Sequence, residues 1–336
     1  MTEQKRVTIV VPVYNEGDNI PHFTRAVMEA MTGLPYRYEI LFVDDGSCAE
    51  SRRVLRETAR REPHVRGIFL SRNYGHQAAL TCGIDHAEGD AVITMDGDMQ
   101  HPPALLPRLL ALWAQGYEVV QTIRETTQGV SAFKRLTSKY YYKFLNLIAA
   151  VPIQPGGSDF RLMDREVVLA FRRYREHDRF IRGLVGAMGF RQVQVRFAAP
   201  ERYAGQSKFS LKKMAKFALD GILGNSIVPL RVSFYIGVLS LFVSLALLAH
   251  VFYEELLGTT VAGWSTLMVC LSFFGGTQLM VLGVLGEYVG RIFREVKGRP
   301  LYLIEPEHAD ELTEEQGGRG SHAAVTRHLR PLDFSR

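Results

Sequence analysis

Two aspartates that stand one residue apart, Asp96 and Asp98, are the residues of this chain whose spacing points most directly to chemistry. They follow the apolar run Ala91–Met95 and precede two prolines. Side chains of an extended chain alternate between two faces, so both carboxylates would project the same way if that conformation continues. Two negative charges at that distance repel each other unless a positive charge lies between them. The pair therefore forms either a solvated turn or a cation site.

Alternating apolar runs and helical patterns predict the elements that position these aspartates. The β-rich runs are Val7–Tyr14, Tyr38–Asp44, Val65–Ser71, Ala91–Asp96 and Glu118–Ile123, and the helical patterns between them are Ile20–Met31, Glu50–Arg61, Gln77–Glu88 and Ala104–Gln115. This repetition predicts an α/β fold with a mostly parallel sheet and buried strands. Ligands of such sheets bind at the carboxyl ends of the strands.

Polar residues gather at four of these predicted strand ends, in the stretches "VYNE", "VDDGS", "SRNYGHQ" and "MDGDMQ". The first end lacks the Gly-x-Gly-x-x-Gly of a dinucleotide site, and no P-loop motif occurs in the chain. The carboxylates at these ends are Glu16, Asp44, Asp45, Asp96 and Asp98. So acidic a pocket suits a nucleotide-diphosphate sugar bound with Mg²⁺ or Mn²⁺, because hard cations take carboxylate oxygens and substrate phosphates.

Two uncharged apolar runs in the C-terminal part predict membrane spans. Val232–Phe252 and Gly263–Leu285 contain no Asp, Glu, Lys or Arg, and each reaches the roughly 20 residues that a helix needs to cross a bilayer. The link Tyr253–Ala262 carries glutamates but no basic residue, whereas lysines and arginines flank both outer ends of the pair. The positive-inside rule therefore predicts a transmembrane hairpin in the cytoplasmic (inner) membrane, with both termini in the cytoplasm.

These runs divide the chain into parts. We expect a cytoplasmic α/β domain at residues 1–207, amphipathic juxtamembrane helices at 208–230, two membrane helices within 231–287, and a cytoplasmic C-terminal segment at 288–336 with a disordered end. The N-terminus leads directly into a strand and lacks the apolar core of a signal peptide. The net charge of +5 is explained by the juxtamembrane lysines and arginines, so no nucleic-acid partner is expected. Three scattered cysteines predict neither a disulfide framework nor a zinc site.

Two spacings near the end of the second predicted span concern helix packing. Gly286 and Gly290 form a G-x-x-x-G, which permits close packing either within the hairpin or between protomers. Glu287 and Arg291 are spaced to form an ion pair on one helix face at the membrane edge. We also expect a homo-oligomer, with a tetramer as one arrangement.

Five motifs in order resemble the inverting GT-A glycosyltransferases of family 2. They are "VVPVYNE" (Val10–Glu16), "VDDGS" (Val43–Ser47), "RNYGHQAAL" (Arg72–Leu80), "MDGDMQHPP" (Met95–Pro103) and "SDFRL" (Ser158–Leu162). After the predicted spans, "GEYVGRIFREVKGRPLY" (Gly286–Tyr302) resembles the polyisoprenyl-phosphate branch of that family, which includes GtrB-like bactoprenol glucosyltransferases and dolichol-phosphate mannose synthase. The resemblance implies that residues 1–207 form a GT-A catalytic domain.

The resemblance implies a role for each matching residue on the donor side. The positions that hold the donor nucleotide are matched by Pro12, Tyr14, Glu16, Val43, Asp44, Asp45 and Asp96. Asp96 and Asp98 match the D-x-D pair, and Gln100 matches a third position near the metal, Mg²⁺ or Mn²⁺. A cation that bridges both aspartates to the donor diphosphate would offset the repulsion between their negative charges. His76 either touches the donor or the metal or is structural.

Cationic residues are expected on the acceptor side, because Arg and Lys suit phosphate by charge and Ser by hydrogen bonding. The resemblance places the acceptor phosphate near Arg124, Lys134, Arg135 and Ser138, and a loop that closes over the diphosphate at Arg202, Ser207 and Lys208. Taken singly, these residues also fit a solvated helix or loop surface. Asp159 matches an acid near the acceptor, and we expect it to orient the acceptor and Arg124 or Lys134, with any role as a base secondary.

The combined interpretation is a membrane-anchored, metal-dependent glycosyltransferase. We expect it to transfer glucose from UDP-glucose to undecaprenyl phosphate with inversion, which gives a lipid-linked sugar for cell-envelope glycan or lipid modification. One alternative is a processive or hydroxyl-acceptor membrane glycosyltransferase, although processive synthases carry Gln-x-x-Arg-Trp and the stretch Gln121–Glu125 lacks the Trp. The other is a non-enzymatic lipid-binding or flippase-like membrane protein, for which two spans are few and a D-x-D pair has no purpose.

Overall fold

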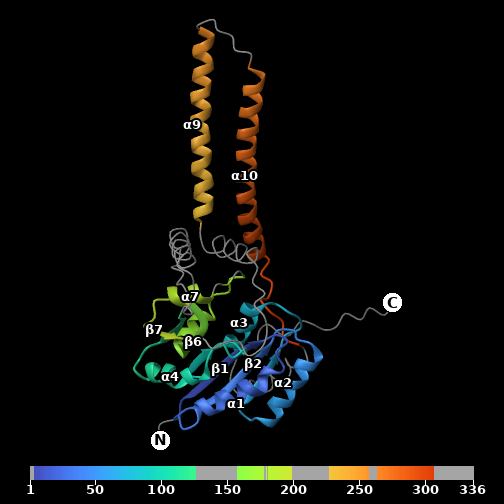
Figure 1. The fold of residues 1–336 in the computed structure, drawn as a ribbon, viewed down its shortest axis with the longest axis vertical. Helices are drawn as coiled ribbons and strands as arrows, with labels where there is room; N and C mark the ends of the chain where they lie inside the picture. The colour runs from blue at the N-terminus through green and yellow to red at the C-terminus, as the bar shows by residue number, and fades with distance from the viewer. Residues whose placement is uncertain are drawn as a thin grey trace, which may run out of the picture.

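The computed structural model of the 336-residue chain describes residues 4–125, 157–177, 179, 181–198, 227–256 and 263–305. Over these residues the chain forms an α/β domain from which two long helices extend (Figure 1). Several predicted parts lie outside the described residues, namely Lys134, Arg135, Ser138, Arg202, Ser207, Lys208, most of the juxtamembrane segment 208–230 and the C-terminal residues from 306 onward.

Among the described residues, a seven-stranded sheet forms the centre of the domain in the order β3-β2-β1-β4-β6-β5-β7. Its strands are β1 (Arg6–Val13), β2 (Arg37–Asp44), β3 (Val65–Phe69), β4 (Ala91–Thr94), β5 (Val119–Arg124), β6 (Gly157–Asp164) and β7 (Gln192–Phe197). Strand β6 runs antiparallel to β4 and β5, whereas every other pairing is parallel. The predicted α/β fold and mostly parallel sheet are confirmed; β6 and β7 are strands that the sequence pattern did not predict.

Helices cover both faces of this sheet, and this explains why its strands are apolar runs rather than alternating ones. The helices of the domain are α1 (Asn19–Met31), α2 (Ala49–Arg61), α3 (His76–His86), the 3-10 turn η1 (Pro103–Leu105), α4 (Leu106–Ala114), α6 (Arg165–Phe171) and α7 (Ile181–Ala187). Neighbouring residues of β1 point to opposite faces. Ile9 and Val11 pack with α1, α2 and α4, while Val10 packs with α3, α6 and α7.

Two long helices, α9 (Val228–Leu256) and α10 (Trp264–Val296), extend from the domain and lie side by side (Figure 1). Helix α9 contains the first predicted span, and α10 contains all of the second except Gly263 and continues beyond it to Val296. Within the described residues, one stretch, Val228–Leu247, is both long and apolar enough to cross a membrane, with a mean hydropathy of 1.9.

The C-terminal half of α10 tests two predicted spacings. The predicted ion pair between Glu287 and Arg291 is confirmed, with 3.3 Å between Oε1 and Nε. Gly286 and Gly290 do not contact α9, because a Cβ on either glycine would meet no atom of the described residues within 4 Å. Packing of the two helices within one chain therefore does not use this glycine pair.

The chain that follows α10 returns to the α/β domain, and we call residues Gly298–Glu305 the return segment. Leu70 and Ile304 form an antiparallel β-bridge, and the N–H of Ser71 donates to the carbonyl of Leu303 at 2.9 Å. These contacts pair the return segment with the residues that directly follow the edge strand β3. The end of the long helix is thereby attached to the sheet.

Candidate active site

Strands β4 and β6 bring the two acidic motifs to one edge of the sheet. Asp96 lies just past the C-terminal end of β4, and the antiparallel direction of β6 puts its first residues at that same edge. In the β4–β6 register Thr94 lies opposite Arg161, and the same register continued by two residues brings Asp159 level with Asp96. The motifs "MDGDMQHPP" and "SDFRL" therefore meet because of strand pairing.

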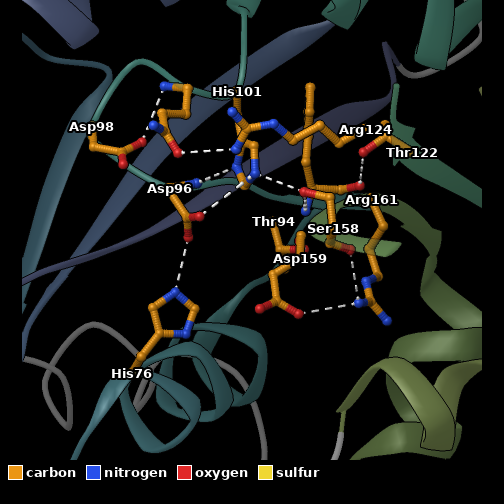
Figure 2. A network of polar contacts seen from close by, with 12 residues as sticks. His76, Thr94, Asp96, Asp98, His101, Thr122, Arg124, Ser158, Asp159 and Arg161 are labelled. Atoms are coloured by element: carbon orange, nitrogen blue, oxygen red, sulfur yellow. Dashed lines mark hydrogen bonds and ion pairs between the residues drawn. The ribbon is translucent and has the colours of Figure 1, made fainter. Parts of the chain in front are cut away.

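Asp96 lies between two histidines (Figure 2). His76 Nε2 is 2.8 Å from Oδ1 of Asp96, and His101 Nε2 is 3.5 Å from Oδ2. Burial by itself would lower the pKa of His76, but the hydrogen bond to Asp96 and its charge raise it above the usual value. For Asp96 burial has the opposite effect and would raise the pKa. The hydrogen bond from His76 nevertheless keeps the pKa of Asp96 below its usual value. Asp96 is therefore ionised at neutral pH.

His101 is buried and ties the D-x-D segment to β6. Its Nδ1 accepts a hydrogen bond from the N–H of Asp96 at 2.8 Å, and its Nε2 lies 2.6 Å from Oγ of Ser158. Because Nδ1 is an acceptor, a neutral ring carries its proton on Nε2, which donates to Ser158. Burial lowers the pKa of His101 and favours this neutral form. Sequence reasoning did not single out His101, although it stands inside the quoted "MDGDMQHPP".

Replacement of His101 by Leu is expected to lower the free energy of unfolding by about 1–3 kcal/mol, because the Asp96 N–H would lose its acceptor. Thermal unfolding of the purified protein, followed by circular dichroism, measures this as a lower Tm. His64→Leu is the control, since His64 is exposed and its Nδ1 lies 3.3 Å from the carbonyl of Tyr38. An unchanged Tm for His101→Leu would contradict the anchoring role.

The D-x-D turn is surrounded by other predicted residues. The N–H of Gln100 donates to Oδ1 of Asp98 at 3.0 Å, and Arg124 at the end of β5 donates to Oε1 of Gln100 at 3.4 Å. Glu16 approaches the same turn, because a Cβ on Gly97 would lie 3.2 Å from its Oε2. Residues at or just past the ends of β1, β4 and β5 thus lie together at one sheet edge.

The side-chain ligands that the turn offers are all oxygens, from Asp96, Asp98 and Gln100, which suits Mg²⁺ or Mn²⁺ better than softer metals. Among the described residues, no three His, Cys, Asp or Glu side chains converge as a complete metal cage. Mg²⁺ is usually bound by one or two carboxylates together with substrate phosphates and water. The residues therefore fit a hard cation that is shared with a diphosphate.

Asp44 and Asp45 follow one another at the end of β2 but make different contacts. Asp45 accepts the N–H groups of Tyr74 and Gly75 at 2.7 and 2.8 Å and so anchors the loop before α3. Burial raises the pKa of Asp45 against the effect of these two bonds. Asp44 instead accepts Nε of Arg52 through Oδ2 at 2.9 Å. Asp45 therefore fixes the backbone of the loop before α3, whereas Asp44 is itself fixed by the guanidinium of Arg52.

The remaining residues of the predicted donor side differ in exposure. Tyr14 is 51 % exposed just after β1 and can be reached by a ligand. Pro12 and Val43 are buried opposite each other in the β1–β2 ladder. A nucleotide could contact the ring of Tyr14 directly, while the side chains of Pro12 and Val43 shape the strand ends beneath it.

Asp159 is held between two arginines. Arg182 donates from Nε to Oδ1 at 2.9 Å and from Nη2 to Oδ2 at 2.8 Å, and Arg161 Nη2 lies 3.3 Å from Oδ1. Burial by itself would raise the pKa of Asp159, but the hydrogen bonds and charge of Arg182, with the charge of Arg161, hold it well below the usual value. Burial lowers the pKa of Arg161 to about 10, so it stays charged at neutral pH.

These partners differ from those expected for Asp159. The sequence linked it to Arg124 or Lys134; within the described part of the chain, its cationic partners are Arg161 and Arg182, and Lys134 lies outside that part. Sequence reasoning missed Arg182 because "FIRGL" matches no chemical motif. Helix α7 packs on β6 and so brings Arg182 to Asp159.

Comparison with known proteins identifies the family. A sequence profile described as "Glycosyl transferase family 2" matches residues 8–171. An uncharacterized glycosyltransferase of Synechocystis is 42 % identical over 299 residues, which cover 89 % of this chain and 94 % of the relative. A bactoprenol glucosyl transferase of Shigella phage SfII is 39 % identical over 304 residues, which cover 90 % and 98 %.

Solved structures give a more distant likeness. A mannosyltransferase of Pyrobaculum calidifontis, in complex with GDP-Man and Mn²⁺, is 15 % identical with a TM-score of 0.43, over 88 % of each chain. That likeness is too distant to inform the chemistry of this chain. The sequence relatives decide the matter: the chain belongs to family 2 of the glycosyltransferases and has the GT-A α/β fold. It is an enzyme that transfers a sugar, as the ordered motifs predicted.

Proposed function

We propose that this enzyme transfers glucose from UDP-glucose to a polyprenyl phosphate such as undecaprenyl phosphate, with inversion at the anomeric carbon. Relatives of similar length named bactoprenol glucosyl transferase support the sugar and the lipid. The observation that carries the proposal is the position of Asp159 between Arg161 and Arg182. The position of Asp159 distinguishes a phosphate acceptor from a sugar hydroxyl acceptor.

A sugar hydroxyl acceptor loses its proton in the transition state and needs a base whose pKa lies near the working pH. Asp159, with its pKa held far below that range, is a weak base. A phosphate monoester has a second pKa near 6, is largely dianionic at about pH 7 and needs no base. The positive charge that Arg161 and Arg182 bring to this carboxylate also favours an anionic acceptor nearby.

The reaction then needs positioned charges rather than proton transfer. An oxygen of the lipid phosphate forms a bond to the anomeric carbon while the bond from that carbon to the donor diphosphate breaks, and the nucleoside diphosphate leaves. In this proposal Tyr14, Glu16 and Asp44 bind the nucleoside. The acceptor phosphate is held by Arg124, Lys134, Arg135 and Ser138, and the loop of Arg202, Ser207 and Lys208 closes over the diphosphate.

A divalent cation, Mg²⁺ or Mn²⁺, would be held by Asp96, Asp98 and Gln100 in this proposal. When bound, it would neutralise negative charge that develops on the departing diphosphate. His101 fixes the backbone of Asp96 against β6, and His76 fixes its carboxylate. The two contacts pre-orient one carboxylate of the pair before the substrate arrives.

The test is a substrate panel with the purified full chain. UDP-glucose, UDP-galactose, UDP-N-acetylglucosamine and GDP-mannose are each offered with undecaprenyl phosphate and Mg²⁺, and the lipid product is identified by mass spectrometry. We expect a single hexose on the lipid phosphate, formed from UDP-glucose. Undecaprenol, which lacks the phosphate, is the matched acceptor control. Transfer to undecaprenol would favour the hydroxyl-acceptor alternative, several hexoses per lipid would favour a processive synthase, and no product from any donor would refute the proposal.

The proposal extends to the membrane, in which both α9 and α10 would span the bilayer as a hairpin. The stretch from Trp264 to Leu285 contains no charged residue, and apolar side chains such as Phe234, Leu239 and Leu279 are largely exposed to the surroundings. Exposed apolar surface on that scale suits lipid rather than water. The outward-facing Gly286 and Gly290 would then serve contact between copies in a homo-oligomer.

This topology predicts that the link between the helices lies outside the cytoplasm. A cysteine introduced at Gly258 is expected to react with a membrane-impermeant maleimide in intact cells, because the basic residues flank the far ends of both helices. Cys48, which is exposed on the α/β domain, is the internal control and should react only after the membrane is opened. A reporter fused after Arg336 should be active only in its cytosolic form. Labelling of Cys48 in intact cells would overturn the topology.

A further inference from the structure

Arg52 of α2 joins three parts of the domain. Its Nε donates to Oδ2 of Asp44 at 2.9 Å, and its Nη2 donates to the carbonyl of Leu70 at 2.9 Å. Its Nη1 lies 3.1 and 3.3 Å from the two carboxylate oxygens of Glu305. All three nitrogens of the guanidinium are therefore used, and the side chain is only 17 % exposed. An arginine fixed in this way has little freedom to move away from Asp44.

Glu305 is the last residue of the return segment, and that segment is firmly seated. The N–H of Glu305 donates to the carbonyl of Phe69 at 2.9 Å, next to the bridge between Leu70 and Ile304. Farther back, Oη of Tyr302 donates to Oδ2 of Asp85 on α3 at 2.9 Å. The backbone of the return segment is therefore held against β3 and α3, and the carboxylate of Glu305 meets Arg52 from this position.

Asp44 uses one of its oxygens for these internal contacts. Oδ2 accepts one hydrogen bond from Nε of Arg52 and another, at 3.2 Å, from the N–H of Ser47. None of the described residues donates a hydrogen bond to Oδ1. The carboxylate, whose side chain is only 2 % exposed, is thus held through Oδ2 at the strand end where the donor nucleotide would bind.

We propose that Arg52 is a positioning residue that holds Asp44 for the nucleoside part of the donor, and that Glu305 holds Arg52 in turn. Affinity for the donor then depends on the return segment, and so on the end of α10. This inference rests on the proposed function, because it takes Asp44 as a group that contacts the nucleotide. A guanidinium carries this role better than an ammonium, since its planar fork serves three acceptors at once.

The inference is tested by binding of UDP, GDP and inorganic diphosphate, each with Mg²⁺, to the full chain in detergent by isothermal titration calorimetry. Glu305→Gln keeps the size of the side chain and removes its charge. It is expected to weaken UDP binding about two- to thirtyfold, the range typical for coupling through an intermediate residue, and to leave diphosphate binding unchanged. In turnover the donor KM should rise while kcat stays constant.

Three variants complete the experiment. Arg52→Lys keeps the charge but lacks the fork, so it should also weaken UDP binding. Arg52→Gln should weaken it further, and adding Glu305→Gln to Arg52→Gln should cost nothing more if Glu305 acts through Arg52. Arg53→Gln is the matched control on the same helix, because Arg53 is exposed and pairs with Glu50 and Glu57 at 2.6 and 2.8 Å. It should bind UDP like the wild type.

The outcomes separate this inference from the proposed function. Wild-type protein that binds neither UDP nor GDP more tightly than diphosphate would refute the nucleotide site, and the inference with it. Wild-type protein that binds UDP, together with a Glu305→Gln variant that binds it equally well, would overturn the inference alone. Equal weakening of UDP and diphosphate would also overturn it, since that is the sign of general loosening of the domain.

Discussion

Replacement of Asp98 by Asn is expected to lower kcat at least about a hundredfold, because the site would lose a group that stabilises charge on the departing diphosphate. Asn keeps the shape of the side chain and its ability to accept the N–H of Gln100, which Asp98 holds at 3.0 Å. The turn should therefore survive while its charge does not. Steady-state rates of lipid glucosylation at saturating donor and acceptor give the measurement.

The control for Asp98→Asn is Glu57→Gln, which removes one negative charge from the exposed face of α2, where Glu57 pairs with Arg53. Its rate should equal that of the wild type. The same preparation should lose activity in excess chelator and regain it when Mg²⁺ or Mn²⁺ is restored. Full turnover in chelator would refute the metal site, and a fully active Asp98→Asn would revive the non-enzymatic lipid-binding alternative.

Replacement of Asp159 by Asn is expected to lower kcat about thirtyfold or more, through loss of the carboxylate that orients Arg182. It should also destabilise the domain by about 3–5 kcal/mol, because Arg161 would remain buried without its counter-charge. Asp164→Asn is the matched control at the other end of β6. Asp164 accepts Nε1 of Trp113 at 2.7 Å and lies away from the site, so its loss should affect Tm more than kcat.

The pH profile separates an orienting role of Asp159 from a role as base. Its pKa in the folded chain is depressed, so the carboxylate is ionised throughout the working range and titrates below its ordinary pKa of about 4. Stability that it contributes is present above that value and is lost only as the pH falls through the depressed pKa. The acidic limb of the rate should instead follow the acceptor phosphate, at about pH 6, in both wild type and Asp159→Asn.

A second substitution keeps this test decisive if Asp159→Asn does not fold. Arg182→Gln leaves Asp159 paired with Arg161 and removes a partly exposed cation, so the domain should stay folded. We expect a clear fall in kcat with the same acidic limb. If the limb vanished in Asp159→Asn while the protein stayed folded, Asp159 would be the titrating group and the hydroxyl-acceptor alternative would gain support.

The α/β part of the fold could be predicted closely from local patterns. Strand β1 and helix α1 follow from the apolar run that starts near Val7 and the helical spacing that starts at Ile20. Period and apolar content are properties of neighbouring residues, so the sequence carries them directly. Strand β7 was not predicted, because Gln192–Phe197 is a short edge strand that contains polar and charged residues and has several exposed positions.

By itself, the sequence determined the α/β alternation, the acidic strand ends at Asp44 and Asp96, and the two uncharged apolar runs, since each depends on residues close together in the chain. Only the tertiary structure decided which distant residues meet. Asp159 joins Asp96 because β6 pairs antiparallel with β4, and Arg52 meets Glu305 because the chain returns to the edge of β3 after α10. Strand order, direction and register set these contacts, and an apolar run does not specify which other strand it will pair with.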